Sequence, residues 1–383
     1  MTENPHPRGT LTVVGTGIVS IGQLTLQAMG HIRTADIVCY VLAEPVTERW
    51  LLDNSHDAED LSRYYDEGST RADSYRLMAS RIQHHVRAGR RVAAVFYGHP
   101  GVFVDPAHRA IRQAREEGFE ARMLPGVSAE DCLFADLGFD PGKTSCETFE
   151  ATEMLIHGRR PSLDTHVIIW QIGVVGNLGF QSTNVPSDLI ALTDYLLEDY
   201  PSDHVVTHYQ CAQYAVCDSV IQRVALTDLP RISPTGASTL YVPPVRPRPS
   251  DQSMAARLDI APQPVAASSD ELATSSLPAH QWYVPVAPGR SRIADLLMKL
   301  AENPNELTAY RAAPRSYLVT AGLDPVEQWA ILSKNHRAIG ECARRGSGPP
   351  AAVALGLATS EGEARSYSTT DDGRLMRPKR SPG

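Results

Sequence analysis

The stretch TLTVVGTGIVSIG (residues 10–22) decides the fold of this chain. Residues 10–15 form a short β-branched run that ends in glycine, a pattern typical of a strand that runs into a tight turn. The residues from Ile18 to Met29 are compatible with a helix. Because a strand followed by a glycine turn and a helix is the repeating unit of α/β folds, we expect an α/β domain to begin here.

The same alternation continues to about residue 140. Further strands are expected at 37–42, in RVAAVF (91–96) and in ARMLP (121–125). Helices are expected at 74–88, at 105–118 and from about Ser128. Strands that alternate with helices favour a largely parallel, doubly wound sheet.

The remaining chain divides by composition. Residues 145–245 contain the strand-like runs THVIIWQI, HVVTHYQ and STLYVPP and a helix at 187–199. We therefore expect one domain over 8–245, with subdomains of about 8–140 and 145–245. Residues 246–289 are rich in Pro, Ser and Ala, which is linker composition. A helical module is expected at 290–345, with short helices that begin or break at Pro304, Pro314 and Pro325. Residues 346–383 form a tail.

Bulk composition excludes several classes of protein. The formal net charge of -8 and the scattered arginines give no footprint for nucleic acid. The six cysteines show no CxxC pair or metal-ligand spacing, so neither a metal site nor a disulfide framework is expected. No signal segment and no apolar run of membrane-spanning length is present, so we expect a cytoplasmic protein without a membrane span.

Three glycine-containing loops follow predicted strands. VVGTGIVSIG lacks the spacing of the dinucleotide fingerprint and reads either as a structural turn or as a ligand loop. FYGHPGVFV (96–104) is either a simple turn with a satisfied histidine or, as its two glycines favour, a ligand loop. In LPGVSAEDCLFADLG (124–138), Ser128 either only caps a helix or helps to line a shared pocket.

A fourth stretch, RYYDEGSTRADSYRLMASRI (63–82), gathers tyrosines and arginines. Arg71 and Tyr75 are four residues apart and share one face if the segment is helical. The segment is either a solvated helix start or a phenol and guanidinium site. The latter could hold an oxyanion and assist proton removal without a metal or a thiolate.

Together, TLTVVGTGIVSIGQLTLQAM, FYGHPGVFV and MLPGVSAEDCLFADLG resemble the tetrapyrrole-methylase-like superfamily, over about residues 8–245. The closer resemblance is to the borosin peptide backbone α-N-methyltransferases. It implies a two-subdomain α/β fold of the tetrapyrrole methylase type with a C-terminal helical substrate-docking module. It also implies that S-adenosylmethionine binds between the subdomains. By position, the cofactor contacts are Tyr97, His99, Val102, Ser128, Ala129, Gln171, Tyr209, Ser238 and Thr239.

The family's catalytic group matches Tyr65, Arg71 and Tyr75, with Tyr97 orienting the reacting groups. The resemblance implies that Arg71 and Tyr75 stabilise the carbonyl oxygen of an amide and that Tyr65 helps to remove its proton. Family members often carry another tyrosine three residues before the position of Tyr65. This chain has Ser62 there, with Tyr64 nearby, so that contact does not carry over.

The resemblance also gives the C-terminal region a role. Read alone, GSGPPAAVALGLATS (346–360) looks like a disordered terminus. In the fused borosins, a helical domain that binds the precursor is followed by a core peptide whose own backbone is methylated. This pattern implies a flexible leader into a core peptide at Ala351–Thr359, methylated in trans within a homodimer during biosynthesis of a ribosomal peptide product.

Three alternatives remain open at this stage. One is a small-molecule methyltransferase of the tetrapyrrole type, in which the helical module only regulates or dimerises. Another is a scaffold that binds the cofactor without catalysis, although the tyrosine and arginine cluster argues against it. A third stays within the family: the charged residues near Arg365 and Asp371 fit a core peptide poorly, so the enzyme could act on a separate peptide.

Overall fold

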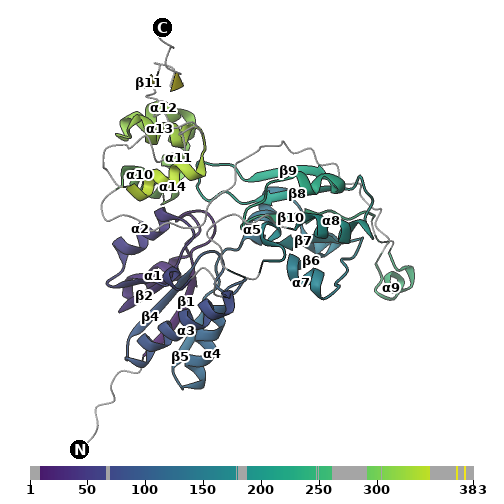
Figure 1. Cartoon of the computed structure of the whole chain (residues 1–383), viewed down its shortest axis with the longest axis horizontal. Coiled ribbons are helices and arrows are strands. Elements are labelled where there is room, and N and C mark those ends of the chain that lie inside the picture. The colour runs from purple at the N-terminus through teal and green to yellow at the C-terminus, as the bar shows by residue number, and fades with distance from the viewer. Residues whose placement is uncertain are drawn as a thin grey trace, which may run out of the picture. The chain divides into compact units, whose positions relative to one another are not determined.

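The computed structural model describes residues 9–65, 70–177, 179, 188–246, 248, 250–260, 291–302, 304–345, 368–369 and 375–376. The chain forms two compact units (Figure 1). The first consists of Met1–Ala129, Ala212–Asp218 and Trp282–Gly383, and the second of Glu130–Cys211 and Ser219–Gln281. The candidate core peptide and most of the expected linker lie outside the described residues.

A five-stranded parallel sheet forms the centre of the first unit. Its strands are β1 (Thr10–Gly15), β2 (Ile37–Val41), β3 (Ala58–Asp60), β4 (Arg91–Phe96) and β5 (Glu120–Met123). Their order is β3-β2-β4-β1-β5, and all neighbours are parallel. The predicted α/β class is confirmed. β-branched and small apolar residues fill these strands, since helices cover both faces of the sheet.

Two pairs of helices cover the two faces of this sheet. Val14, Val38 and Val95 pack towards α1 (Leu26–Thr34) and α2 (Pro45–Asn54). The alternate residues Val13 and Cys39 pack towards α3 (Arg71–Arg87) and α4 (Asp105–Glu116). The short helix η1 (Ser62–Tyr64) lies between β3 and α3. Successive strand residues thus serve opposite cores, as the pleat requires.

The expected helix from Ile18 to Met29 is wrong for its first half, because α1 begins only at Leu26. The Gln23 side-chain oxygen accepts hydrogen bonds from the backbone N–H groups of Ile18 (2.7 Å) and Val19 (3.0 Å). This side chain holds residues 16–24 as a folded loop. The helix then starts where Thr25 caps it by accepting a bond from the Ala28 N–H.

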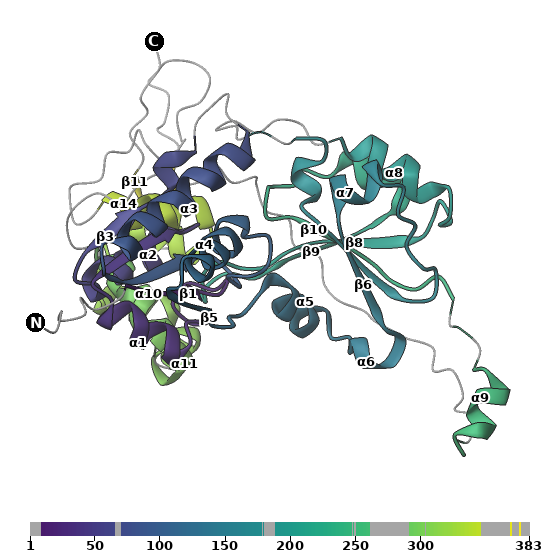
Figure 2. The ribbon, with the colours of Figure 1, turned by 90° about the horizontal axis from the view of Figure 1, so that it is seen from below.

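The second unit contains a mixed five-stranded sheet. Its strands are β6 (Cys146–Glu150), β7 (His166–Trp170), β8 (Val205–Gln210), β9 (Val220–Ala225) and β10 (Thr239–Val242), in the order β6-β7-β10-β8-β9. Its helices are α5 (Ala129–Leu137), α6 (Pro141–Thr144), α7 (Ala151–Ile156), α8 (Leu189–Leu197), η2 (Ile172–Val174) and η3 (Leu226–Arg231). Helices α7 and α8 cover one face of the sheet (Figure 2).

Five short helices make up the helical module in the first unit. They are α10 (Arg292–Glu302), α11 (Pro304–Ala312), α12 (Pro314–Thr320), α13 (Pro325–Leu332) and α14 (His336–Arg345). Each of the three prolines singled out in the sequence is the first residue of a helix, where its fixed φ fits and its missing N–H costs nothing. Shorter elements are α9 (Gln252–Arg257), β11 (Ser368–Thr369) and β12 (Leu375–Met376).

The module shares its core with the first sheet. Helices α10 and α14 pack against α2 (Figure 1). Module residues such as Ile293, Leu297 and Ile339 are buried in the same cluster as Trp50 of α2 and Tyr214. In energetic terms the module is part of the first unit, because part of its apolar surface is removed from water by packing against α2. Among the described residues, no helix combines the length and apolarity needed to cross a membrane.

Glu44, which precedes α2, is a buried acidic residue. Its carboxylate caps the helix by accepting bonds from the N–H groups of Val46 (2.7 Å) and Thr47 (2.8 Å). The residue is only 4% exposed, and burial raises the pKa of its carboxyl group. The folded protein therefore holds this proton at a higher pH than the unfolded chain does, and stability falls as pH rises through that interval.

We predict that Glu44→Gln, which cannot ionise, gains stability relative to the natural chain as pH rises from about 4.5. Each unit by which the native pKa is raised contributes about 1.4 kcal/mol to this difference. Urea unfolding at a series of pH values would measure it. Below pH 4.5 the two chains should differ in unfolding free energy only by a constant amount, which comes from the altered helix cap. A difference that does not change with pH would contradict the prediction.

Candidate active site

The loops after β1 and β4 are joined backbone to backbone. Gly17 donates its N–H to the Gly98 carbonyl (3.3 Å), and Gly98 donates to the Gly17 carbonyl (3.0 Å). Both glycines have φ near +74°, in the region that favours glycine. A Cβ on Gly15 would lie 2.1 Å from the Gly98 carbonyl oxygen. The carboxyl ends of these two strands therefore meet without intervening side chains.

The loop after β5 packs against the same place. A Cβ on Gly126 would lie 3.4 Å from the Gly98 oxygen and 3.5 Å from Cα of Gly15. Ser128 follows, is 8% exposed and directly precedes α5, which begins at Ala129. Three adjacent strands thus end at one glycine-lined edge, where open parallel sheets bind their ligands.

The predicted side chains of the β4 loop lie at this edge. Tyr97 is half-buried and donates its N–H to the Val41 carbonyl of β2 (3.1 Å). His99 accepts a hydrogen bond at Nδ1 from the Gly101 N–H (3.0 Å), which shapes the loop. Val102 is 41% exposed. His99 is therefore a satisfied histidine within a loop that still presents Tyr97 and Val102.

The predicted catalytic residues form a second group in the same unit. Tyr65 follows η1, whereas Arg71 begins α3 and Tyr75 lies one turn later. The rings of Tyr65 and Tyr75 meet edge to face with centroids 6.3 Å apart. Burial raises the pKa of the Tyr65 phenol, and its hydrogen bond and proximity to Tyr75 raise it further, whereas Arg71 opposes the rise. Residues 66–69, between Tyr65 and Thr70, lie outside the described part of the chain.

The position of Arg71 is informative. It is the first residue of α3, capped by Thr70, so a guanidinium lies at the positive end of the helix dipole. This placement is unfavourable for stability by a few tenths of a kcal/mol. The helix dipole and this guanidinium both add positive potential near the start of α3, where Asp73 supplies a negative charge.

The predicted residues of the second unit also come together. Thr239 pairs with Tyr209 across β10 and β8, and the Ser238 carbonyl accepts a hydrogen bond from the Ile172 N–H (3.2 Å). Gln171, just before Ile172, has φ +61°, a backbone conformation that residues other than glycine rarely adopt. These residues thus gather at the ends of β7, β8 and β10.

Most of their hydroxyl groups already have partners inside the second unit. Tyr209 donates to Oδ2 of Asp136 (2.8 Å). The Ser238 hydroxyl accepts from the Thr235 N–H (2.8 Å) and lies 2.8 Å from Nε2 of His208. Asp136 thus takes up the donor hydrogen of Tyr209, and the Ser238 hydroxyl has two partners.

Three residues with structural roles at the site were not expected from the sequence. Asp136 accepts bonds from Tyr209 and from Ser219 (2.6 Å), so one carboxylate fixes two chain segments. Gln23 organises the loop after β1. Ile21 in that loop has φ +58°, which costs of order 1–3 kcal/mol for a β-branched residue. The glycines at 17 and 22 were the local signal for this loop.

One buried cluster could hold a metal by geometry alone. Cys39, Glu59 and His85 place potential ligand atoms within 4.8 Å of one another. Arg81 binds the Glu59 carboxylate (2.8 and 2.9 Å), and Arg63 also pairs with it. Burial raises the pKa of the Cys39 thiol to about 12. Two guanidinium groups and a protonated thiol disfavour a cation here, so the cluster is better described as a buried ion-pair network.

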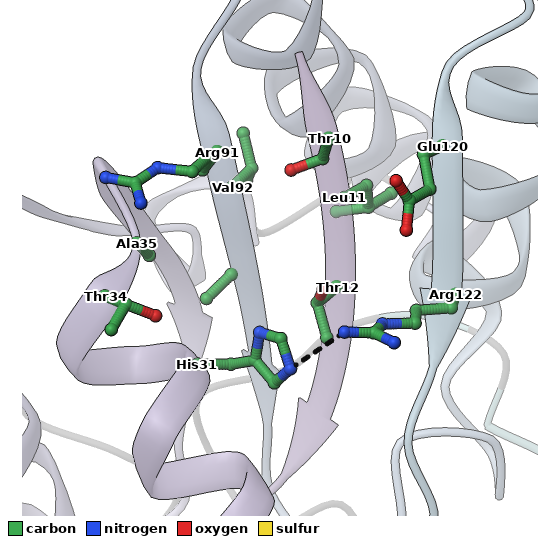
Figure 3. Close-up of a pocket in the computed structure, with 11 residues that line it drawn as sticks. Thr10, Leu11, Thr12, His31, Thr34, Ala35, Arg91, Val92, Glu120 and Arg122 are labelled. Carbon is green, nitrogen blue, oxygen red and sulfur yellow. Dashed lines mark hydrogen bonds between the residues drawn. The ribbon is translucent and has the colours of Figure 1, made fainter. Parts of the chain in front are cut away.

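A hollow of about 190 Å³ lies at the opposite end of the first sheet (Figure 3). Thr10, Arg91 and Glu120, the first residues of β1, β4 and β5, help to line it. Arg122 donates to Nε2 of His31 there (3.1 Å), and burial lowers the pKa of that imidazole, with Arg122 adding to the effect. Since ligands of open α/β sheets bind at the carboxyl ends, this hollow is separate from the candidate site.

Comparison with known proteins identifies the family. Residues 10–174 match the family described as tetrapyrrole (corrin/porphyrin) methylases. The chain is 36% identical to the methyltransferase and cyclic peptide omphalotin A precursor of Omphalotus olearius, over 86% of this chain and 88% of that protein. It is 41% identical to a type I borosin cyclic peptide precursor of Serendipita vermifera subsp. bescii, over 74% of this chain and 70% of that protein.

The chain belongs to the borosin family of methyltransferases fused to peptide precursors. Similarity extends over most of the sequence, so it includes the helical module as well as the two sheets. A third borosin precursor, from Coprinopsis marcescibilis, is 37% identical over 91% of this chain and 95% of that protein. The expected family and the assignment as a methyltransferase are thus confirmed.

We predict that Gly15→Ala disrupts the glycine-lined edge of this borosin methyltransferase. Its Cβ would collide with the Gly98 carbonyl, a backbone atom that cannot swing aside. We expect a loss of more than about 2 kcal/mol of unfolding free energy, measured by urea denaturation.

Gly30→Ala is the matched control, because a Cβ there meets nothing within 4 Å and Gly30 lies inside α1. Replacing a helix glycine by alanine should stabilise by about 0.5–1 kcal/mol. Equal effects of the two substitutions would mean that the close contact between the loops is absent.

Proposed function

We propose that this borosin methyltransferase uses S-adenosylmethionine to methylate backbone amide nitrogens in its own C-terminal tail. The candidate core peptide is Ala351–Thr359, and the reaction takes place in trans within a cytoplasmic homodimer. The cluster of Tyr65, Arg71 and Tyr75 carries this proposal, because it joins two phenols to a guanidinium at a helix start. The names of the relatives, which combine a methyltransferase with a peptide precursor, support it.

The chemistry of an amide explains why such a cluster is needed. The nitrogen lone pair is delocalised into the carbonyl, so the nitrogen is a very poor nucleophile. It becomes reactive when the N–H proton leaves and negative charge collects on the carbonyl oxygen. Arg71 and Tyr75 would stabilise that oxygen by donating hydrogen bonds. The dipole of α3, which begins at Arg71, adds positive potential at the same place.

The raised pKa of Tyr65 defines how the proton leaves. A phenol whose pKa is raised by burial stays protonated at neutral pH, so a resting phenolate is not the base. Tyr65 is hydrogen-bonded to Tyr75. In the proposed step, the Tyr65 oxygen accepts the amide proton while its own proton passes to bulk water, through Tyr75 or a bridging water. The phenol is neutral before and after the transfer.

The glycine-lined edge fits a cofactor that needs close backbone approach. Tyr97, His99, Val102, Ser128 and Ala129 would hold it on the first unit. Gln171, Tyr209, Ser238 and Thr239 are the proposed contacts from the second, where Tyr209 also donates to Asp136 and Ser238 accepts from Thr235. When bound, S-adenosylmethionine would supply an electrophilic methyl group. Tyr97 would orient the amide towards it.

We predict that the protein methylates its tail when expressed in a host that supplies the cofactor. Trypsin releases Gly346–Arg365, and tandem mass spectrometry should show a ladder of methyl groups on backbone nitrogens between Ala351 and Thr359. Arg71→Ala and Tyr75→Phe should reduce this methylation by about 100-fold or more, because each removes a donor to the developing oxyanion.

Arg76→Ala is the matched control for Arg71, since Arg76 lies on the same helix, is exposed and pairs with Asp73. It should methylate the tail within about twofold of the natural chain. Calorimetry with S-adenosylhomocysteine should show that the Arg71 and Tyr75 variants still bind the cofactor product. An unmodified tail on a chain that binds S-adenosylhomocysteine would overturn the tail as substrate and leave a methyltransferase acting on another molecule.

Transfer between subunits has its own test. We predict that an Arg71→Ala chain, co-expressed with an active chain, acquires methyl groups on its tail. Ser347→Ala in the inactive chain marks its tryptic peptide by mass without altering Ala351–Thr359. Methylation confined to the unmarked peptide would show that each subunit modifies only itself.

A further inference from the structure

The segment Ala212–Asp218 leaves the second unit and lies within the first. On one side it contacts the loop after β1. The Gln213 carbonyl accepts a hydrogen bond from the Ser20 N–H at 2.7 Å. Ser20 belongs to the loop that carries Gly17, and Gly17 is bonded to Gly98 of the β4 loop. The segment is thus connected by backbone hydrogen bonds to the glycine-lined edge.

On its other side the segment contacts the helical module. Tyr214 is 2% exposed and is buried in the cluster that contains the module helices. Its ring centroid lies 5.9 Å from that of His336, and a Cβ on Gly340 would lie 3.5 Å from the phenol oxygen. Cys217 donates its thiol to the Lys334 carbonyl (3.6 Å). The start of α14 and the turn before it therefore hold this segment.

The loop that receives the segment has a conformation that needs support. Ile21 is buried and has a positive φ of 58°, which an isolated β-branched residue avoids. Its N–H donates to Oγ1 of Thr47 in α2 (3.3 Å), and its side chain lies in the same core as Tyr214. A strained backbone conformation persists only where surrounding contacts hold it in place. For this loop, the contacts come from α2, from Gln213 and from the core shared with the module.

We propose that Ala212–Asp218 transmits the packing of the helical module to the cofactor loops, with Tyr214 as the positioning residue. The module then has a second role beside carrying the tail, since it keeps the loop after β1 in the shape that meets Gly98. This inference rests on the proposed function in one respect, namely that the glycine-lined edge binds S-adenosylmethionine. The coupling between module and loop is independent of that assignment.

The test uses the full-length chain and two measurements. Hydrogen exchange at the Ser20 amide, without cofactor, reports the loop directly, because that N–H is the donor to Gln213. The dissociation constant for S-adenosylhomocysteine, measured by calorimetry, reports the cofactor edge. We expect Tyr214→Ala to speed the exchange and weaken binding by about tenfold each, about 1.4 kcal/mol. Tyr214→Phe, which keeps the ring, should stay within twofold.

Leu318→Ala controls for simple loss of stability. Leu318 is fully buried in α12, whose main packing partners are the module helices α11 and α13. It should lower the melting temperature and leave Ser20 exchange and S-adenosylhomocysteine binding within twofold. Both measurements are made well below the melting temperatures, so that global unfolding does not contribute to the exchange.

A second pair of variants acts from the module side and applies even where Tyr214→Ala does not fold. Gly340→Ala places a Cβ at ordinary contact distance from the Tyr214 phenol, whereas Gly340→Leu pushes the phenol away. Only the leucine variant should reproduce the fast exchange at Ser20. Unchanged Ser20 exchange in Tyr214→Ala would overturn the proposal. If Tyr214→Ala does not fold, unchanged exchange in Gly340→Leu would do so. An equally large change in Leu318→Ala would also overturn it. A natural chain that fails to bind S-adenosylhomocysteine would contradict the proposed function alone, and the exchange data would still decide the coupling.

Discussion

The reciprocal hydrogen bonds between Gly17 and Gly98 are the constraint on which the candidate site of the first unit depends. They extend the contact of β1 with β4 beyond the ends of both strands. A side chain cannot be added at Gly15 or Gly17 without a shift of this junction, because a Cβ there would meet other atoms at less than 2.5 Å. Backbone groups therefore meet closely here, and the β4 loop that carries Tyr97, His99 and Val102 begins at the same junction.

The local sequence was sufficient to predict the parallel sheet and the proline-started helices, because these follow from short-range patterns of apolar, glycine and proline residues. It failed for the helix expected from Ile18, since long-range interactions act there beside the local bonds from Gln23. Ser20 is bonded to Gln213, and Ile21 is bonded to Thr47. No periodicity in residues 16–24 or 212–218 reveals that pairing, and so the return of 212–218 to the first unit could not be read from the sequence.

The candidate site shows the same division. Residue types and family pattern were enough to name Tyr65, Arg71 and Tyr75, which the structure brings together. They could not show what each group already binds. The partner of the Tyr209 hydroxyl is Asp136, 73 residues earlier in the chain. A motif gives the identity of a side chain, whereas its remaining capacity for hydrogen bonds depends on neighbours supplied by tertiary packing.

The core shared by α2 and the helical module bears on how this chain could be re-engineered. Its buried residues extend to Ala343, near the end of α14. Within the described part of the chain, no residue beyond Arg345 belongs to this core. Exchanging the sequence after Arg345 would therefore leave every known core contact in place. Moving the module to a separate chain would instead expose apolar surface on both pieces. The chain is suited to carrying new peptide cargo at its end, but not to being divided before α10.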